Sequence, residues 1–123
     1  MDTKKILVIT GSPRIGGNSD MLADAFIKGV KAKGHSIKKF NTVENPIRGC
    51  IACNTCWSKG TACSFKDGFT KLEPLLEEAD VIVLAYPLYW FGMTAHIKSA
   101  IDKFYAYLSQ NRKTSLKVND VHC

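Results

Sequence analysis

The sequence predicts an α/β fold in which helices cover both faces of one parallel sheet, giving three layers. Two short apolar runs, Lys5–Thr10 and Asp80–Tyr86, have the continuous hydrophobicity of parallel strands that are buried on both faces. Amphipathic segments follow both runs, and this alternation is typical of a parallel sheet with right-handed crossovers. The 123 residues fit one domain, residues 1–123, with a single core.

The first unit is a strand, a glycine-rich loop and a helix. Lys5–Thr10 is the strand, and apolar side chains then recur at helical spacing through residues 21–30. Asn18 or Ser19 is available as the N-cap of this helix, and Gly34 as its stop. The apolar residues of the helix are Met21, Leu22, Ala25, Phe26 and Val30.

The second and third units are less regular. His35–Asn41 alternates apolar residues with lysines and predicts a second strand near the sheet edge. After a cysteine-rich loop over residues 49–63, a helical face is expected, although Pro74 removes a hydrogen bond there and either splits the helix or starts its main part. The strand Asp80–Tyr86 follows, and the last helix begins near Thr94. The helical faces consist of Phe69, Leu72, Leu75, Leu76 and Ala79 and, in the last helix, Ile97, Ile101, Phe104, Tyr105 and Leu108.

The polar tail, residues 109–123, is left unassigned. Three apolar residues in it, Leu116, Val118 and Val121, hint at a fourth strand. We expect the strand order 2-1-3, in which the apolar third strand needs a neighbour, because an exposed edge would pair with another chain. Either the tail supplies that neighbour or a second copy does, and the short tail favours a homodimer.

Composition excludes several classes of protein. The net charge is +6, but the clustered lysines have no interleaved aromatic residues, so a solvated basic face is favoured over a nucleic-acid patch. These lysines are Lys28, Lys31, Lys33, Lys38 and Lys39. No apolar run approaches the roughly 20 residues of a membrane span, and the N-terminus lacks the pattern of a signal peptide. We therefore expect a soluble, cytoplasmic protein that binds neither nucleic acid nor a membrane.

The loop Gly11–Ser19 carries the features of a phosphate site. It lies between a buried strand and a helix start, where free backbone N–H groups and the helix dipole favour an anion. The candidate binding residues are Ser12, Arg14, Gly17, Asn18 and Ser19. The pattern is neither the dinucleotide glycine motif nor a P-loop. The alternative is a glycine-rich connector with an N-cap.

A second loop, residues 87–93, follows the third strand. Tyr89, Trp90 and Phe91 form an aromatic run on which a flat ring could stack, with backbone N–H groups within reach of its polar edge. The alternative is a set of buried aromatic side chains that pack a helix onto the sheet.

Together the two loops resemble the NADPH-dependent FMN reductase family, through Gly11-Ser-Pro-Arg, Gly17-Asn-Ser and Pro87-Leu-Tyr-Trp-Phe-Gly-Met93. The resemblance covers about residues 1–108 and implies a flavodoxin-like fold, with the FMN phosphate on the first loop and the flavin ring against the second. The implied cofactor-binding residues are Ser12, Arg14, Gly17, Asn18, Ser19, Pro87, Leu88, Tyr89, Trp90, Phe91 and Gly92. No side chain is needed as an acid or base, so no catalytic residue is expected.

The same resemblance implies an FMN-dependent oxidoreductase that takes reducing equivalents through flavin N5 from NAD(P)H or a cluster. It would pass them to a small-molecule or protein acceptor. A non-enzymatic electron carrier and a non-catalytic flavodoxin-like module are the alternatives. The last two strand–helix units of the family fold are missing or unrecognisable, and with them the loop that closes over the flavin. The chain either binds FMN weakly, borrows that wall from a partner, or is a truncated form.

Five cysteines in a chain without an export signal argue against a disulfide framework. Cys50, Cys53, Cys56 and Cys63 have the spacing C-x2-C-x2-C-x6-C, which suits the ligands of an iron–sulfur cluster. The motif resembles the iron–sulfur flavoprotein branch of the family, in which four such cysteines hold a [4Fe-4S] cluster. The close spacing of Cys50, Cys53 and Cys56 argues mildly against a zinc site, which usually draws two separated pairs of cysteines. Free thiols or a reversible disulfide would also be compatible with this spacing. Cys123 lies outside the motif.

Overall fold

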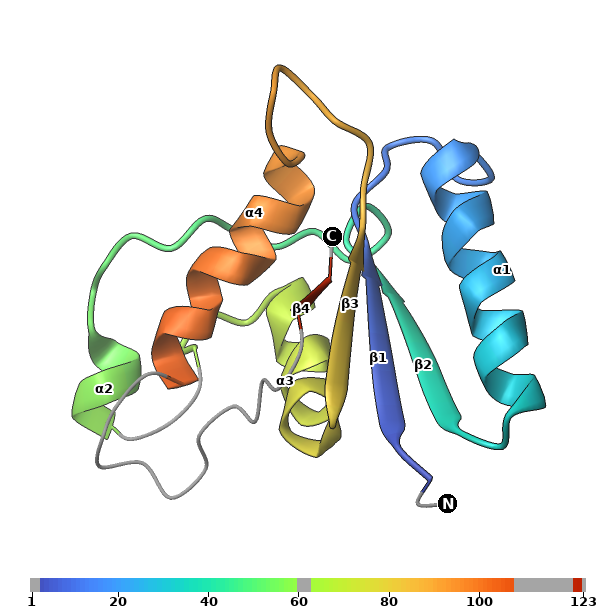
Figure 1. Cartoon of the computed structure of the whole chain (residues 1–123). Coiled ribbons are helices and arrows are strands. Elements are labelled where there is room, and N and C mark those ends of the chain that lie inside the picture. Colours follow the sequence, from blue (N-terminus) through green and yellow to red (C-terminus); the bar gives the residue numbers. More distant parts are fainter. Residues whose placement is uncertain (1–2, 60–62, 108–120, 123) are drawn as a thin grey trace.

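A computed structural model of the chain describes residues 3–59, 63–107 and 121–122. Its sheet has four parallel strands in the order β2-β1-β3-β4 (Figure 1). The strands are β1 (Lys5–Thr10), β2 (Ser36–Asn41), β3 (Val81–Ala85) and β4 (Val121–His122). The predicted α/β fold and the strand order 2-1-3 are therefore confirmed.

The helices are α1 (Asn18–Ala32), α2 (Thr55–Lys59), α3 (Gly68–Glu78) and α4 (Ala95–Asp102), and α4 continues as the 3-10 helix η1 (Lys103–Tyr107). Two expectations were wrong. The cysteine loop contains a short helix, α2, and Pro74 neither splits α3 nor starts it. The helix is continuous because buried side chains on both sides of the proline, Leu72 and Leu76, anchor it to the core.

The main core lies between the sheet and two helices, α3 and α4. Side chains alternate between the two faces of a strand, so Leu7 and Ile9 of β1 share a face with Ile82 and Leu84 of β3. All four are buried in one cluster with residues of α3 and α4. The helical members of that cluster are Phe69, Leu72, Leu76, Ile97 and Ala100.

The opposite face of the sheet is covered only in part, by α1. Val83 and Ala85 of β3 line an open pocket with α1, and the cavity volume is about 280 Å³. Leu22 and Phe26 line the same pocket and are 72% and 41% exposed. The apolar residues that predicted this helix are therefore largely solvent-accessible, because α1 packs against a face with no second described helix beside it (Figure 1).

The edge of β3 has a neighbour within the chain. Ile82 pairs with Val121 and Val83 with His122, in parallel register. This agrees with the first of the two alternatives for that edge, a strand from the tail; Leu116 and Val118 lie outside the described residues. The homodimer stays a prediction. The edge of β3 that suggested it is already partly paired with β4. Within the described ranges, no helix is long and apolar enough to cross a lipid bilayer.

Candidate functional site

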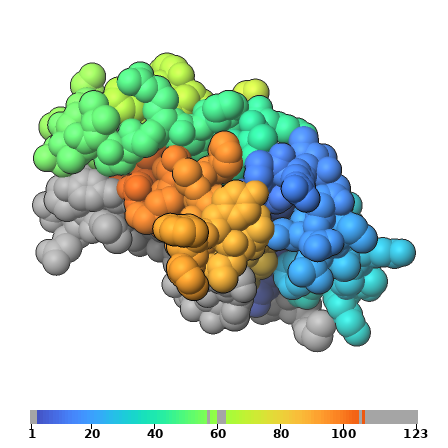
Figure 2. All heavy atoms as spheres, turned by 90° about the horizontal axis from the view of Figure 1, so that it is seen from above, coloured from blue at the N-terminus to red at the C-terminus, as the bar shows by residue number. Residues whose placement is uncertain are grey.

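The two predicted binding loops lie next to each other at the carboxyl edge of the sheet. Figure 2 looks onto this edge and shows the loop after β1, in blue, beside the loop after β3, in gold. Thr94, the N-cap of α4, joins them, because its Oγ1 donates a hydrogen bond of 2.8 Å to the Gly11 carbonyl oxygen. The Gly11 N–H in turn donates to the Ala85 carbonyl oxygen at 2.9 Å. The sequence identified Thr94 only as a helix start. Its contact with Gly11 cannot be predicted from neighbouring residues, because the two lie 83 residues apart in the chain.

Glycine is required at position 11 by close packing. A Cβ built there would lie 2.0 Å from the Ile97 Cγ1 and 2.8 Å from the Thr94 Oγ1. Such distances are far below normal van der Waals contact, so any larger residue would force α4 away from β1. The junction between the two loops therefore depends on the small size of Gly11.

We expect Thr94→Val to lower the free energy of unfolding by about 2 kcal/mol, because it removes a helix cap and leaves the buried Gly11 carbonyl without its donor. Urea unfolding monitored by circular dichroism measures this. Ser99→Ala is the matched control, since the Ser99 hydroxyl donates to the Ala95 carbonyl within α4 on the exposed side. Equal losses for the two variants would contradict the proposed role of Thr94.

The loop after β1 presents an open helix N-terminus. Gly17 is the N-cap of α1 and has no side chain to cap it, so the prediction of Asn18 or Ser19 as N-cap was wrong. Both residues are already helical, and their backbone N–H groups have no intrahelical acceptor. These N–H groups and the positive end of the helix dipole are suited to an anion such as a phosphate.

The other predicted phosphate residues flank this N-terminus. The Ser12 side chain is buried, and its Oγ accepts the Arg14 N–H at 3.1 Å, which curls the loop. Arg14 is exposed and its guanidinium can reach a ligand from solvent. Gly16 has a φ of +82°, a backbone conformation that favours glycine.

Asp20 shapes this loop, and it was missed in the sequence. Its Oδ2 accepts the Gly16 N–H at 2.8 Å, and its Oδ1 lies 2.6 Å from the Lys39 Nζ on β2. The hydrogen bond from Lys39, followed by that from Gly16, lowers the pKa of the Asp20 carboxyl. The feature of the sequence that could have identified Asp20 is its place as an acidic residue in the first turn of a helix.

Two of the five clustered lysines form ion pairs. Lys39 pairs with Asp20, and Lys38 pairs with Glu78.

Asp20 gives the protein a pH dependence whose sign follows from its pKa. A carboxyl whose pKa is lower in the folded state stabilises the fold above its unfolded pKa, and this stability is lost as the pH falls through the folded pKa. We expect wild-type stability to fall below about pH 4, and Asp20→Asn to flatten that fall while costing about 1 kcal/mol at pH 7. Asp24→Asn is the control, because Asp24 pairs with the same Lys39 but is 61% exposed. Identical pH profiles for wild type and Asp20→Asn would refute the assignment.

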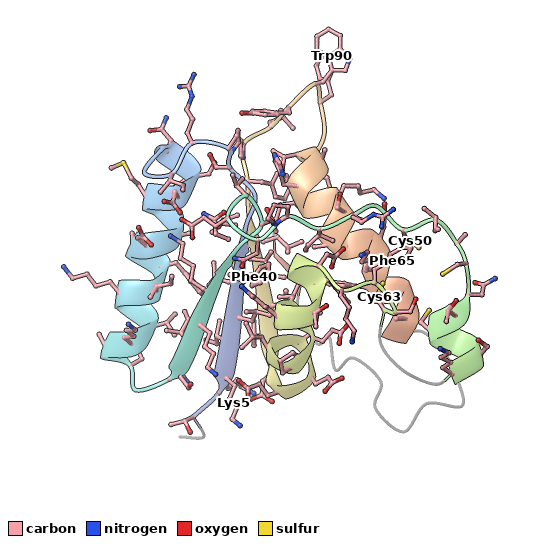
Figure 3. The ribbon with its side chains drawn as sticks, turned by 180° about the vertical axis from the view of Figure 1, so that it is seen from behind. Lys5, Phe40, Cys50, Cys63, Phe65 and Trp90 are labelled. Atoms are coloured by element: carbon pink, nitrogen blue, oxygen red, sulfur yellow. The ribbon has the colours of Figure 1, made fainter. Side chains whose placement is uncertain are left out.

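The loop after β3 holds its aromatic side chains outward. Tyr89 and Gly92 exchange backbone hydrogen bonds of 2.9 and 3.0 Å around Trp90 and Phe91, whose φ angles are +50° and +65°. The two central side chains are 95% and 91% exposed, and Trp90 points away from the fold (Figure 3). The alternative of buried aromatics that pack a helix was therefore wrong for these two residues. Leu88 is also exposed, Pro87 is half-buried, and the whole loop offers an apolar face to a flat ring.

The four cysteines of the motif line one small, open pocket with a cavity volume of about 30 Å³. Between them, Ala52 and Asn54 have left-handed φ angles of +57° and +59°. Residues that alternate in this way turn backbone N–H groups inward and form concavities that bind anions, including iron–sulfur clusters. The Thr55 hydroxyl and backbone N–H both hydrogen bond to Cys53 and lower the pKa of its thiol.

The cysteines share this pocket without being gathered into a ligand set. All four are free thiols, and within residues 3–59, 63–107 and 121–122 no group of three or more His, Cys, Asp or Glu side chains is close enough to hold a metal. The donor chemistry and the concave backbone fit an iron–sulfur cluster, whereas the sulfur atoms would have to move toward one another to bind one.

Comparisons with known proteins identify the family of the chain. The family model for NADPH-dependent FMN reductase matches residues 4–118, so the match extends past Leu108 into the tail. An iron–sulfur flavoprotein of Archaeoglobus fulgidus is 36% identical over 103 residues, which cover 84% of this chain and 46% of that protein. An iron–sulfur flavoprotein of Methanosarcina thermophila is 27% identical and covers 80% of this chain and 51% of its own length.

Solved structures support the fold. The NAD(P)H:quinone oxidoreductase from Methanothermobacter marburgensis superposes with a TM-score of 0.75 over 98% of this chain and 63% of that protein. The two sequences are 18% identical, so this similarity concerns the architecture alone. The chain spans about half the length of the curated relatives it matches.

Proposed function

Because the chain belongs to the NADPH-dependent FMN reductase family, we propose that it forms the FMN-binding part of an NAD(P)H-dependent oxidoreductase. The observation that carries this proposal is the hydrogen bond between Thr94 and Gly11, which holds an open helix N-terminus beside an exposed aromatic loop. A phosphate donor site and a stacking surface at one sheet edge suit a flavin mononucleotide.

In this proposal the loop after β1 binds the phosphate. The backbone N–H groups of Asn18 and Ser19 donate to it, Arg14 supplies a charged donor, and Gly17 lets the backbone approach closely. Ser12 contributes its hydroxyl after exchanging its contact with Arg14. Asp20 holds the turn at Gly16 from behind, with its own charge compensated by Lys39.

The loop after β3 would bind the ring. Trp90 and Phe91 supply apolar surface, and the backbone of residues 87–92 supplies polar groups for the edge of the ring. When bound, FMN would supply the redox chemistry, in which two electrons and one proton leave NAD(P)H to give NAD(P)+ and pass to a small-molecule or protein acceptor. The protein's part is to bind, orient and shield the ring, so no side chain is assigned as an acid or base.

We also propose that Cys50, Cys53, Cys56 and Cys63 hold a [4Fe-4S] cluster. Their shared pocket, the left-handed residues between them and the hydrogen bonds from Thr55 to Cys53 support this. The iron–sulfur flavoproteins to which the chain is similar support it further. Such a cluster would supply one-electron transfer, and α4 would lie between it and the aromatic loop (Figure 2).

The test is anaerobic reconstitution of the chain with FMN, iron and sulfide, followed by quantification of flavin, iron and sulfide on one sample. We expect about one FMN per chain, about four iron atoms per chain, and NADPH oxidation when an acceptor is present. Bound cofactors without NADPH oxidation would favour a non-enzymatic electron carrier. A chain that takes up no FMN would overturn the flavoprotein proposal.

A further inference from the structure

We propose that Lys103, held in place by Asp67, is a positioning residue that sets the electrostatic potential of the cysteine pocket. The inference rests on the proposed cluster and concerns how easily that cluster is reduced. Lys103 lies at the start of η1, within the core rather than on the surface, and its ammonium belongs to none of the loops assigned to FMN.

The ion pair between these two residues is almost completely buried. The Lys103 Nζ lies 2.8 Å from the Asp67 Oδ2, and the two side chains are only 1% and 9% exposed. A charged amine is rarely buried to this extent unless it is paired, and an apolar residue would be the simpler choice for stability alone. The retained charge is therefore a candidate for a functional role.

Asp67 ties together the two ends of the cysteine segment. Its Oδ2 also accepts the Arg48 N–H at 2.9 Å, two residues before Cys50, and its Oδ1 accepts the Phe69 N–H at 2.8 Å as the N-cap of α3. Asp67 itself follows Cys63 by four residues. Lys103 thus neutralises the carboxylate of Asp67, which lies just after the last cysteine of the motif and binds the backbone just before the first.

Lys103 lines the cysteine pocket, together with Phe65, whereas Asp67 is not among the residues that line it. The Lys103 Nζ lies 5.2 Å from the centroid of the Phe65 ring, and the Arg48 guanidinium lies 4.8 Å from the same centroid. Figure 3 shows Phe65 between Cys50 and Cys63 beside the end of α4. The buried ammonium of Lys103 therefore lies next to Phe65, which lines the same pocket as the four cysteines.

The effect of Lys103 and Asp67 on the reduction potential follows from the charge of a cluster with four thiolate ligands. A cluster with four thiolate ligands is anionic and becomes more negative on reduction, so a nearby buried cation stabilises the reduced form. Lys103 should therefore raise the reduction potential, and Asp67 should lower it. A purely structural role would make both residues matter for stability, but would not give their removal opposite effects on the potential.

The test is the midpoint potential of the reconstituted [4Fe-4S] cluster, measured by spectroelectrochemistry in wild type, Lys103→Met and Asp67→Asn. We expect a lower potential in Lys103→Met and a higher one in Asp67→Asn, since Asn keeps the helix cap but leaves Lys103 uncompensated. Lys103→Arg should keep the wild-type value. Lys31→Met is the control, because Lys31 is a solvent-exposed cation on α1, which covers the other face of the sheet, and its loss should leave the potential unchanged.

The outcomes separate this inference from the function on which it rests. If wild type takes up no iron, the cluster proposal fails and this inference fails with it. If the cluster forms and the two variants have unchanged potentials, or shifts of the same sign, only the role of Lys103 is overturned. Should Lys103→Met not fold, the sign of the shift in Asp67→Asn still decides the matter.

Discussion

Gly68→Ala is expected to lower the free energy of unfolding by about 3 kcal/mol or more, and so to unfold much of the protein. A Cβ at this position would lie 2.1 Å from the Asn45 carbonyl oxygen and 2.7 Å from the Pro46 carbonyl oxygen. Both are backbone atoms that cannot rotate away, and the Gly68 N–H already donates to the Pro46 carbonyl at 2.9 Å. The start of α3 and the segment before the cysteines would have to separate.

The matched control is Gly29→Ala, because Gly29 lies inside α1 and a Cβ there meets nothing within 4 Å. That change should raise stability by about 0.5–1 kcal/mol, as alanine favours a helix over glycine. Urea unfolding of both variants measures the contrast. A Gly68→Ala variant as stable as wild type would show that the chain near Asn45 can move without penalty.

Cys53→Ser is expected to remove most of the iron that the reconstituted protein binds, while FMN binding stays near the wild-type level. Cys53 is the central member of the cysteine triple and accepts the hydrogen bonds from Thr55. Serine has a similar size but is a poor ligand for a cluster that thiolates hold. Iron, sulfide and flavin analyses on the same sample measure both effects.

Cys123→Ser is the control for this prediction, since Cys123 lies outside the four-cysteine motif. It should leave the iron content unchanged. Full iron content in Cys53→Ser would exclude Cys53 as a ligand. Loss of iron together with FMN would instead point to a folding defect, which circular dichroism would reveal.

The two central strands of the sheet could be predicted from the sequence. The two apolar runs gave β1 and β3 to within a residue, because a strand in the centre of a parallel sheet needs continuous hydrophobicity. β2 was also found, with weaker patterning, since it is an edge strand. Pro74 was misjudged because its tolerance depends on the packing of Leu72 and Leu76, which is a tertiary effect.

The parts of the candidate site that consist of residues close together in the sequence could be predicted. The glycine loop, the aromatic run and the cysteine triple are each continuous in sequence, and the structure places the first two side by side. Thr94, Asp67 and Lys103 were not identified as site residues, because each acts through a partner distant in sequence. Threonine, aspartate and lysine occur at helix ends for many reasons, so their roles depend on the fold.

The outward turn at Trp90 and Phe91 has a consequence for affinity. Two backbone hydrogen bonds close the turn, so its conformation is fixed before any ligand arrives. Left-handed φ angles at two bulky residues cost roughly 1–2 kcal/mol each, and the fold has already met that cost. A ring that stacks here therefore loses little additional loop entropy on association, and more of its contact energy is available for binding.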